Sequence, residues 1–232
     1  MTNGESPSDA QPATARRSRK LQTGRLEALS DGVFAIAVTL LVLDIKVPAH
    51  NGQLLHAIAG SWPSYLAYVV SFSTIGAIWL GHNAITEYLD RADSGFVRLN
   101  LLVLLLVSFL PLPTRLLADY IDQAGPERVA ATMYGLSLLL ASTLLLALWK
   151  YAVRARLVRP DAADEEIQLL TKRLTPGLVA YLVLIVAGLF VPVIAVAGYL
   201  AIAVYLIIPF KHRFIVSFRR RRPGARQRDS LS

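Results

Sequence analysis

The 232-residue sequence contains no cysteine, which excludes a disulfide framework, a thiolate metal site and a cysteine nucleophile. Its four histidines are scattered and lack the spacing of a metal site, so we expect neither a resident metal nor a cofactor. The His-Glu-x-x-His, Gly-x-Ser-x-Gly and phosphate-binding glycine-loop motifs are also missing from the sequence. The sequence therefore predicts a protein that is not an enzyme.

Charged residues are scarce. They make up 17% of the chain, whereas 54% of the residues are hydrophobic and the mean hydropathy is +0.48. Soluble domains carry about 25% charged residues. The apolar residues are also grouped into long runs, which is typical of an integral membrane protein rather than of a large soluble core. We predict an all-α integral membrane protein.

Six apolar runs predict six transmembrane helices per subunit, because a spanning helix needs about 20 mostly apolar residues. The last two form one stretch of about 50 Å, too long for a single crossing of a ~30 Å hydrocarbon core. We divide this stretch at Pro192, since proline ends one helix and favours the first turn of the next. The predicted helices run roughly from Leu29 to Val47, Trp62 to Ala84, Phe96 to Leu117, Val129 to Tyr151, Pro176 to Val191 and Pro192 to Phe210.

Basic residues set the orientation. With six spans, 21 of the 24 lysines and arginines fall on one side, which the positive-inside rule makes cytoplasmic, together with both termini. We expect residues 1–24 to be a disordered basic tail, residues 25–211 the transmembrane domain and residues 212–232 a second basic tail. The tails are expected to contact anionic lipid and not nucleic acid, since they lie next to the membrane.

Polar residues gather at the cytoplasmic ends of the first three predicted helices. An unpaired charge in a membrane costs about 2.5–3.5 kcal/mol, so these groups should pair. The alternative is an interfacial belt, in which Arg25 reaches the headgroups, Trp79 joins an aromatic girdle and Ser30 or Asp31 caps a helix. We favour a network that joins Arg25, Asp31, His82 and Asn83, with Ser30 as an added donor and with Trp79, Arg98 and Asn100 at the same depth.

The first predicted helix also has an apolar stripe. Ile36, Leu40 and Leu43 lie at positions i, i+4 and i+7 of one face, with Thr39 nearly on it and Asp44 beyond it at the outer end. Ordinary helix packing is one interpretation. The other is a ring of such helices around a narrow pore, because hydrophobic constrictions gate channels by dewetting. Carboxylates of Asp44 around the outer mouth would then concentrate cations.

The stretch "RLEALSDGVFAIAVTLLVLDI", residues 25–45, resembles the signature of the lysosomal potassium channel family (transmembrane protein 175) and its prokaryotic homologues. Arg25, Ser30 and Asp31 match the family's motif, and Leu29 stands where the family has phenylalanine. The resemblance covers roughly residues 25–115 and includes "SFSTIGAIWLGHN" and "RLNLLVLLLVSFLPLPT".

The resemblance implies a potassium channel of a prokaryotic plasma membrane, with modest selectivity over sodium. Prokaryotic members carry one six-helix repeat and form homotetramers, and the motif occurs once in this chain. By this analogy the first helix lines a pore around a fourfold axis. Ile36 forms the constriction, Leu40 and Leu43 form further apolar rings, and Thr39 favours potassium, so K+ is expected to pass close to Ile36 and Thr39.

Two other functions stay open on the sequence alone. Asp31 and His82 could relay protons, because carboxylates and histidines within membranes do so in transporters. A secondary transporter, however, usually shows internal repeats and helices broken near the midplane, and the only broken region here surrounds Pro192. The third candidate is a structural scaffold that passes no current.

Overall fold

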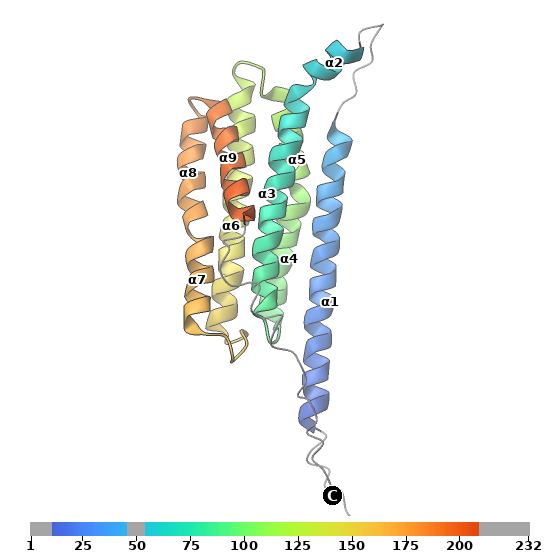
Figure 1. Ribbon diagram of the computed structural model, residues 1–232, viewed down its shortest axis with the longest axis vertical. Coiled ribbons are helices and arrows are strands. Elements are labelled where there is room, and N and C mark those ends of the chain that lie inside the picture. The colour runs from blue at the N-terminus through green and yellow to red at the C-terminus, as the bar shows by residue number, and fades with distance from the viewer. Residues whose placement is uncertain (1–10, 46–53, 209–232) are drawn as a thin grey trace, which may run out of the picture.

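The computed structural model describes residues 11–45 and 54–208, with side chains from Thr23 onward except that of Pro176. Within these ranges the regular structure is helical, apart from an isolated β-bridge between Leu89 and Val158. The helices lie side by side as an elongated bundle, with α1 on one flank and α7 and α8 on the opposite flank (Figure 1). The predicted all-α fold is confirmed.

The described helices begin and end within three residues of the predicted ones, except at the start of the first, and the third predicted helix is divided into α4 and α5. Five helical segments are long and apolar enough to cross a membrane, and α9, with 16 residues, is shorter. The predicted break at Pro192 is confirmed, since one helix ends at Gly188 and the next begins at Pro192. The bounds are α1 Gln11–Leu40, η1 Leu41–Asp44, α2 Leu54–Gly60, α3 Trp62–Glu87, α4 Ser94–Phe109, α5 Pro111–Tyr120, α6 Pro126–Arg154, α7 Asp164–Leu174, α8 Pro176–Gly188 and α9 Pro192–Ile207.

Two segments that we predicted to be irregular are helical. Helix α1 begins at Gln11, so residues 11–24 continue the first spanning helix and are not a disordered tail. Alanine, arginine, lysine and leucine favour helix, and a helix that has already started extends at little cost. Residues 1–10 and the whole predicted tail 212–232 lie outside the described part of the chain.

Helix α7 occupies part of the predicted loop between the fourth and fifth spans. Its first turn carries Asp164, Glu165 and Glu166, and its last turn carries Lys172 and Arg173. This order of charges complements the helix dipole, because acidic groups stabilise the amino end and basic groups the carboxyl end. These residues, which the predicted helices left in a connection, therefore form a short helix.

Two connections that contain basic residues, 88–93 between α3 and α4 and 155–163 between α6 and α7, meet at one end of the bundle (Figure 1). The backbone of Asp90 donates to Leu157, at 2.8 Å, and that of Arg159 donates to Tyr88, at 2.9 Å. The Arg159 guanidinium also lies over the Tyr88 ring, 5.7 Å from its centroid. Burial and the nearby Glu166 carboxylate raise the pKa of Tyr88. This ring is therefore neutral at physiological pH, and its electron-rich face can attract the Arg159 cation.

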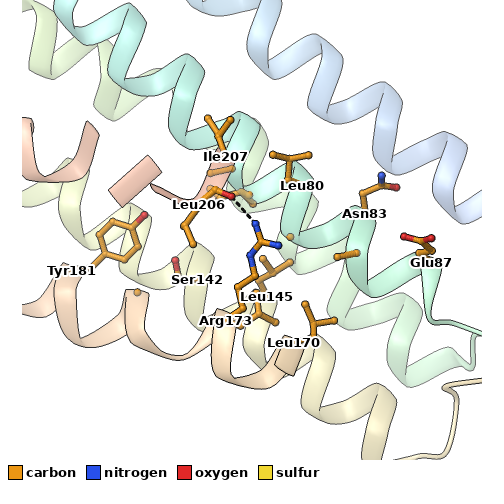
Figure 2. Close-up of a pocket in the computed structure, with 16 residues that line it drawn as sticks. Leu80, Asn83, Glu87, Ser142, Leu145, Leu170, Arg173, Tyr181, Leu206 and Ile207 are labelled. Carbon is orange, nitrogen blue, oxygen red and sulfur yellow. Dashed lines mark hydrogen bonds between the residues drawn. The ribbon is translucent and has the colours of Figure 1, made fainter. Parts of the chain in front are cut away.

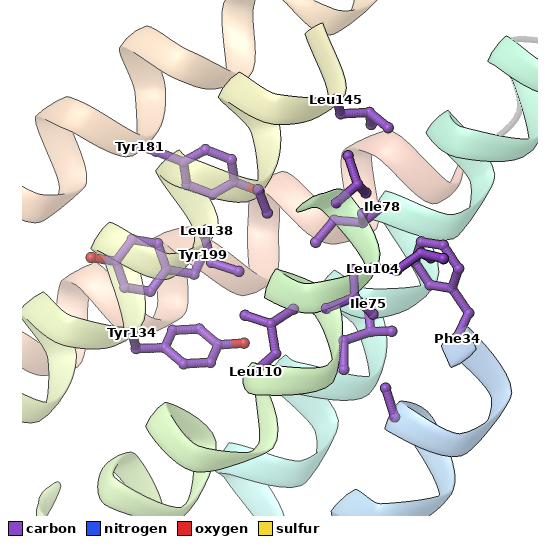
Figure 3. Packing of buried hydrophobic residues seen from close by; sticks show 14 of the residues in the cluster. Phe34, Ile75, Ile78, Leu104, Leu110, Tyr134, Leu138, Leu145, Tyr181 and Tyr199 are labelled. Carbon is purple, nitrogen blue, oxygen red and sulfur yellow. The ribbon is translucent and has the colours of Figure 1, made fainter. Parts of the chain in front are cut away.

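The interior contains a hydroxyl cluster that joins three helices. The Ser71 hydroxyl of α3 lies 2.7 Å from that of Thr114 on α5 and 3.1 Å from that of Tyr134 on α6. The Thr74 hydroxyl of α3 lies 2.8 Å from that of Tyr134. Tyr134, Leu110 and Ile75 belong to the same packed core (Figure 3). Hydroxyl groups often link helices within membranes, because hydrocarbon offers them no other partner. The cluster fixes the register of α3, α5 and α6.

Close helix contact at Gly135 generates a stability prediction. A Cβ atom there would collide with the hydroxyl of Tyr199 and would lie 2.7 Å from Ile185 Cγ1. We expect Gly135→Ala to lower the free energy of unfolding by about 1–3 kcal/mol, the usual cost of overpacking. The midpoint of thermal unfolding in detergent measures this change.

Gly76→Ala is the matched control, because a Cβ at Gly76 meets nothing within 4 Å and alanine has the higher helix propensity. Its unfolding midpoint should equal or exceed that of the wild type. An equal loss of stability in both variants would contradict the close contact at Gly135.

Candidate functional site

Helix α1 packs on the rest of the bundle through one stripe, mainly against α3 and α4. The buried side chains of this stripe are those of Leu26, Ser30, Phe34, Ala37 and Leu41, which recur every three or four residues. This spacing keeps one helical face turned inward. The buried stripe therefore fixes which side of α1 faces away from the bundle.

The predicted pore stripe lies on the side of α1 that faces away from the bundle. Ile36 is 60% exposed, Leu40 43% and Leu43 76%, and Thr39 is exposed between them. Asp44, at the end of η1, is partly exposed. Figure 1 shows the outer flank of α1 without a neighbouring helix. A single subunit thus presents an uncovered apolar face at membrane depth.

The outer end of α1 changes to 3-10 geometry. In a 3-10 helix, residues three apart lie directly above one another. The transition at η1 therefore favours alignment of Leu43 above Leu40 along the helix axis. One turn below, the Thr39 hydroxyl donates a hydrogen bond to the Ile36 carbonyl oxygen at 2.9 Å. This bond uses the hydroxyl proton and leaves lone pairs on the Thr39 oxygen.

A buried polar chain connects α3, α4 and α1. Asn100 Nδ2 donates to Ser30 Oγ at 3.1 Å, and Ser30 Oγ donates to the Leu26 carbonyl at 2.9 Å. Asn100 Oδ1 lies 2.6 Å from His82 Nε2. Since Asn100 uses its amino group for Ser30, its oxygen accepts, and His82 Nε2 carries the proton. The side chains of His82, Asn100 and Ser30 are at most 2% exposed.

A second, separate contact joins α3 to α1. Trp79 Nε1 donates to Asp31 Oδ1 at 2.9 Å, on the exposed side of the helix pair. The Phe34 and His82 rings pack against each other, with centroids 5.5 Å apart. Five of the eight predicted network residues are therefore brought together, in two groups: Ser30, Asn100 and His82, and Asp31 and Trp79.

The structure does not bring Arg25, Asn83 or Arg98 into these groups; all three are exposed. The reason is helical rotation, which turns successive side chains by about 100°. Asn83 follows His82 by one position, and Arg25 precedes Leu26 by one, so each points away from its buried neighbour. Within the described chain Arg25 and Asn83 therefore lie outside the two groups, because depth alone, without direction, does not decide which side chains meet. Asn100, which we placed only at the same depth, is the central residue of the chain.

The described residues contain no cluster of three histidine, aspartate or glutamate side chains that could hold a metal ion. What the geometry offers instead is an apolar helical face with a hydroxyl oxygen, held in place by two polar contacts. Such a face is available to pack against a second copy of the chain or to line a pore.

Comparisons with known proteins identify the family of this chain. The sequence pattern of the family described as endosomal/lysosomal potassium channel TMEM175 matches residues 25–111. A potassium channel of Chamaesiphon minutus is 44% identical over 164 residues, which cover 68% of this chain and 80% of that relative. The chain belongs to the TMEM175 family. TMEM175 proteins are ion channels, so the prediction that the chain is not an enzyme is confirmed.

Other TMEM175 proteins match over different shares of their length. The crystal structure of a lysosomal potassium-selective channel TMEM175 homolog from Chamaesiphon minutus has a TM-score of 0.72 and 39% identity, and the match covers 79% of this chain and 95% of that one. A potassium channel of Streptomyces collinus is 47% identical over 135 residues, 57% of this chain and 66% of that relative. The endosomal/lysosomal proton channel TMEM175 of Gallus gallus is 36% identical over 146 residues, 59% of this chain and 29% of that relative.

The polar chain generates a second prediction. Asn100→Ala removes the partner of two buried groups, His82 Nε2 and Ser30 Oγ. Leaving buried polar atoms unpaired costs about 1–3 kcal/mol. We expect a lower midpoint of thermal unfolding in detergent for Asn100→Ala.

Arg98→Ala on the same helix is the control, since Arg98 is exposed and lies outside the chain of hydrogen bonds. Its effect should stay within about 0.5 kcal/mol. If Asn100→Ala were as stable as Arg98→Ala, the polar chain would not hold α1 in place.

Proposed function

We propose that this protein is a homotetrameric cation channel that conducts potassium in preference to sodium, with α1 lining the pore and Ile36 at its constriction. The observation that carries the proposal is the uncovered stripe of Ile36, Leu40 and Leu43, which the packed stripe of α1 leaves exposed. One helix cannot enclose a pore, and closed rotational symmetry is the usual way to bring identical faces together. The bacterial relatives named potassium channels support the choice of ion.

Discrimination at Ile36 would rest on dehydration. Potassium holds its water less tightly than sodium, so an apolar constriction costs potassium less. Four Thr39 hydroxyl oxygens, each with its proton donated to an Ile36 carbonyl, can offer lone pairs to the ion. Such a site has few ligands, and we expect modest selectivity from it.

Charges at the two ends complete the proposal. Four Asp44 carboxylates around the outer mouth would raise the local cation concentration. The basic connections would face the cytoplasm of a prokaryote, together with both termini. The basic tails would contact anionic lipid, at about 1 kcal/mol for each basic group near the surface. The second tail, residues 212–232, lies outside the described chain.

A proton pathway is the second candidate, because the animal relatives are named proton channels. Asp31 and His82 are the ionisable groups that would serve it, but they belong to separate hydrogen-bonded groups. Liposome flux separates the two functions. Potassium-driven uptake without a proton gradient supports the potassium channel, whereas flux that requires a proton gradient supports the alternative.

The constriction is tested by Ile36→Ala and Ile36→Asn. Both changes shorten the side chain or make it wettable, so single-channel conductance should increase and the preference for potassium should decrease. Recording in a planar bilayer under a potassium–sodium gradient measures both quantities.

Val38→Ala is the control, because Val38 lies about 200° from Ile36 around α1 and is packed against the core. Its conductance and reversal potential should match those of the wild type. Unchanged currents in both Ile36 variants would remove Ile36 as the constriction.

Asp31→Ala tests the role of the polar contact. Trp79 loses its acceptor, so we expect a smaller tetramer fraction or altered gating, with little change in ion preference. Asp31→Asn keeps an acceptor oxygen and should restore assembly at least in part. Native mass spectrometry gives the tetramer fraction, and the reversal potential gives ion preference. Normal assembly with altered selectivity alone would oppose this role.

A further inference from the structure

A pocket of about 290 Å³ lies on the other side of α3 from the polar chain, between α3, α6, α7, α8 and α9. His82 points to α1, whereas its neighbour Asn83 and, one turn later, Glu87 line this pocket (Figure 2). The Asn83 side chain points away from α1 and therefore lies at this second site. Neither the family match nor the proposed pore assigns a role to this pocket.

The deeper walls of the pocket are apolar. Ile78 of α3, Leu145 of α6 and Leu174 of α7 line it, and the Tyr181 ring stands at its side. Gly81 lets the leucines approach α3 closely, because a Cβ there would lie 2.8 Å from Leu145 Cδ2 and 3.6 Å from Leu174 Cδ2. The apolar part lies within spans of the bundle, where the surrounding solvent is acyl chain.

Two opposite charges line the same pocket without pairing. Arg173 donates one N–H to the Leu206 carbonyl at 2.9 Å, near the end of α9, and its remaining N–H groups are left for another partner. Among the described residues, no basic side chain lies within ion-pair distance of Glu87. Leu174, the neighbour of Arg173, packs at Gly81 of α3. Glu87 follows Gly81 by six residues and therefore lies about 9 Å further along α3, toward its carboxyl end.

We propose that this pocket binds a phospholipid whose zwitterionic headgroup ends in a primary ammonium. The phosphate accepts hydrogen bonds from the Arg173 guanidinium and the Asn83 amide, a pairing that suits the planar donor fork of arginine. The ammonium lies nearer the membrane surface and donates to the Glu87 carboxylate. One acyl chain begins along Leu145 and Leu174.

The arrangement of charges decides between lipid classes. An anionic headgroup would satisfy Arg173 but would be repelled by Glu87. A choline headgroup carries the positive charge but has no N–H to donate, so it loses the hydrogen bonds to Glu87. A free phosphate ion would leave the apolar walls without a partner. A primary ammonium headgroup uses Arg173, Asn83 and Glu87 together.

Native mass spectrometry of the full chain in mild detergent tests the proposal. Dioleoyl phosphatidylethanolamine, phosphatidylcholine or phosphatidylglycerol is added at equal concentration, and the lipid-bound fraction is measured. We expect phosphatidylethanolamine to bind about fivefold more tightly than phosphatidylcholine, which corresponds to one well-placed charged contact at the membrane surface. Equal binding of the two, or strongest binding of phosphatidylglycerol, would overturn the proposal.

Variants test which side chain binds the phosphate and which binds the ammonium of the headgroup. Arg173→Gln should weaken binding of phosphatidylethanolamine and phosphatidylcholine alike by about fivefold. Glu87→Gln should abolish the preference for phosphatidylethanolamine and leave phosphatidylcholine binding unchanged. Lys172→Gln and Glu165→Gln, exposed neighbours on α7 that do not line the pocket, are the charge-matched controls and should bind lipid as the wild type does.

Thermal unfolding midpoints of all four variants show whether each is folded. If the Arg173 and Glu87 variants fold and bind all three lipids like the Lys172 and Glu165 variants, the pocket is not a lipid site. The assay does not depend on ion conduction, so its result is separate from that of the pore experiments.

Discussion

The rotation of α1 about its own axis is the constraint on which the rest of this structure depends. Ser30, Asn100 and His82 form a buried chain of hydrogen bonds, and Asp31 and Trp79 add a second contact beside it. Each unmade bond within a membrane is costly, because hydrocarbon offers no substitute partner. The two contacts therefore hold one face of α1 against α3 and α4 and turn Ile36, Leu40 and Leu43 outward.

Helix α3 has a different role on each of its sides. Toward α1 it carries His82 and Trp79, and toward α7 and α9 it carries Asn83 and Glu87. Between them, Ser71 and Thr74 join the hydroxyl cluster with Thr114 and Tyr134. Helix α3 therefore contacts both the proposed pore helix and the proposed lipid pocket. Any shift of α3 would alter both sites together.

The sequence could predict the spanning helices, because long apolar runs and the proline at position 192 are local signals. It could also predict which residues lie at one depth, but not which way they point. Asn83 and Asn100 show the difference: adjacent turns and neighbouring helices decide that Asn100 is buried and Asn83 is not. The hydroxyl cluster had no sequence signal at all, since serine, threonine and tyrosine are common in membrane helices. Helix α7 did have a sequence signal, because its acidic residues come first and its basic residues last. We did not use this signal and left these residues in a connection between helices.

The most direct test of the proposed pore uses the absence of cysteine from the chain. A single Ile36→Cys substitution places the only thiols of the assembly at the constriction, and four thiolates around one axis would bind Cd²⁺. With Val38→Cys as the reference, potassium current is recorded while Cd²⁺ is added and then removed with a chelator. The account predicts reversible block of Ile36→Cys alone. If Cd²⁺ left the current through Ile36→Cys unchanged and blocked Val38→Cys instead, the result would contradict the proposed pore.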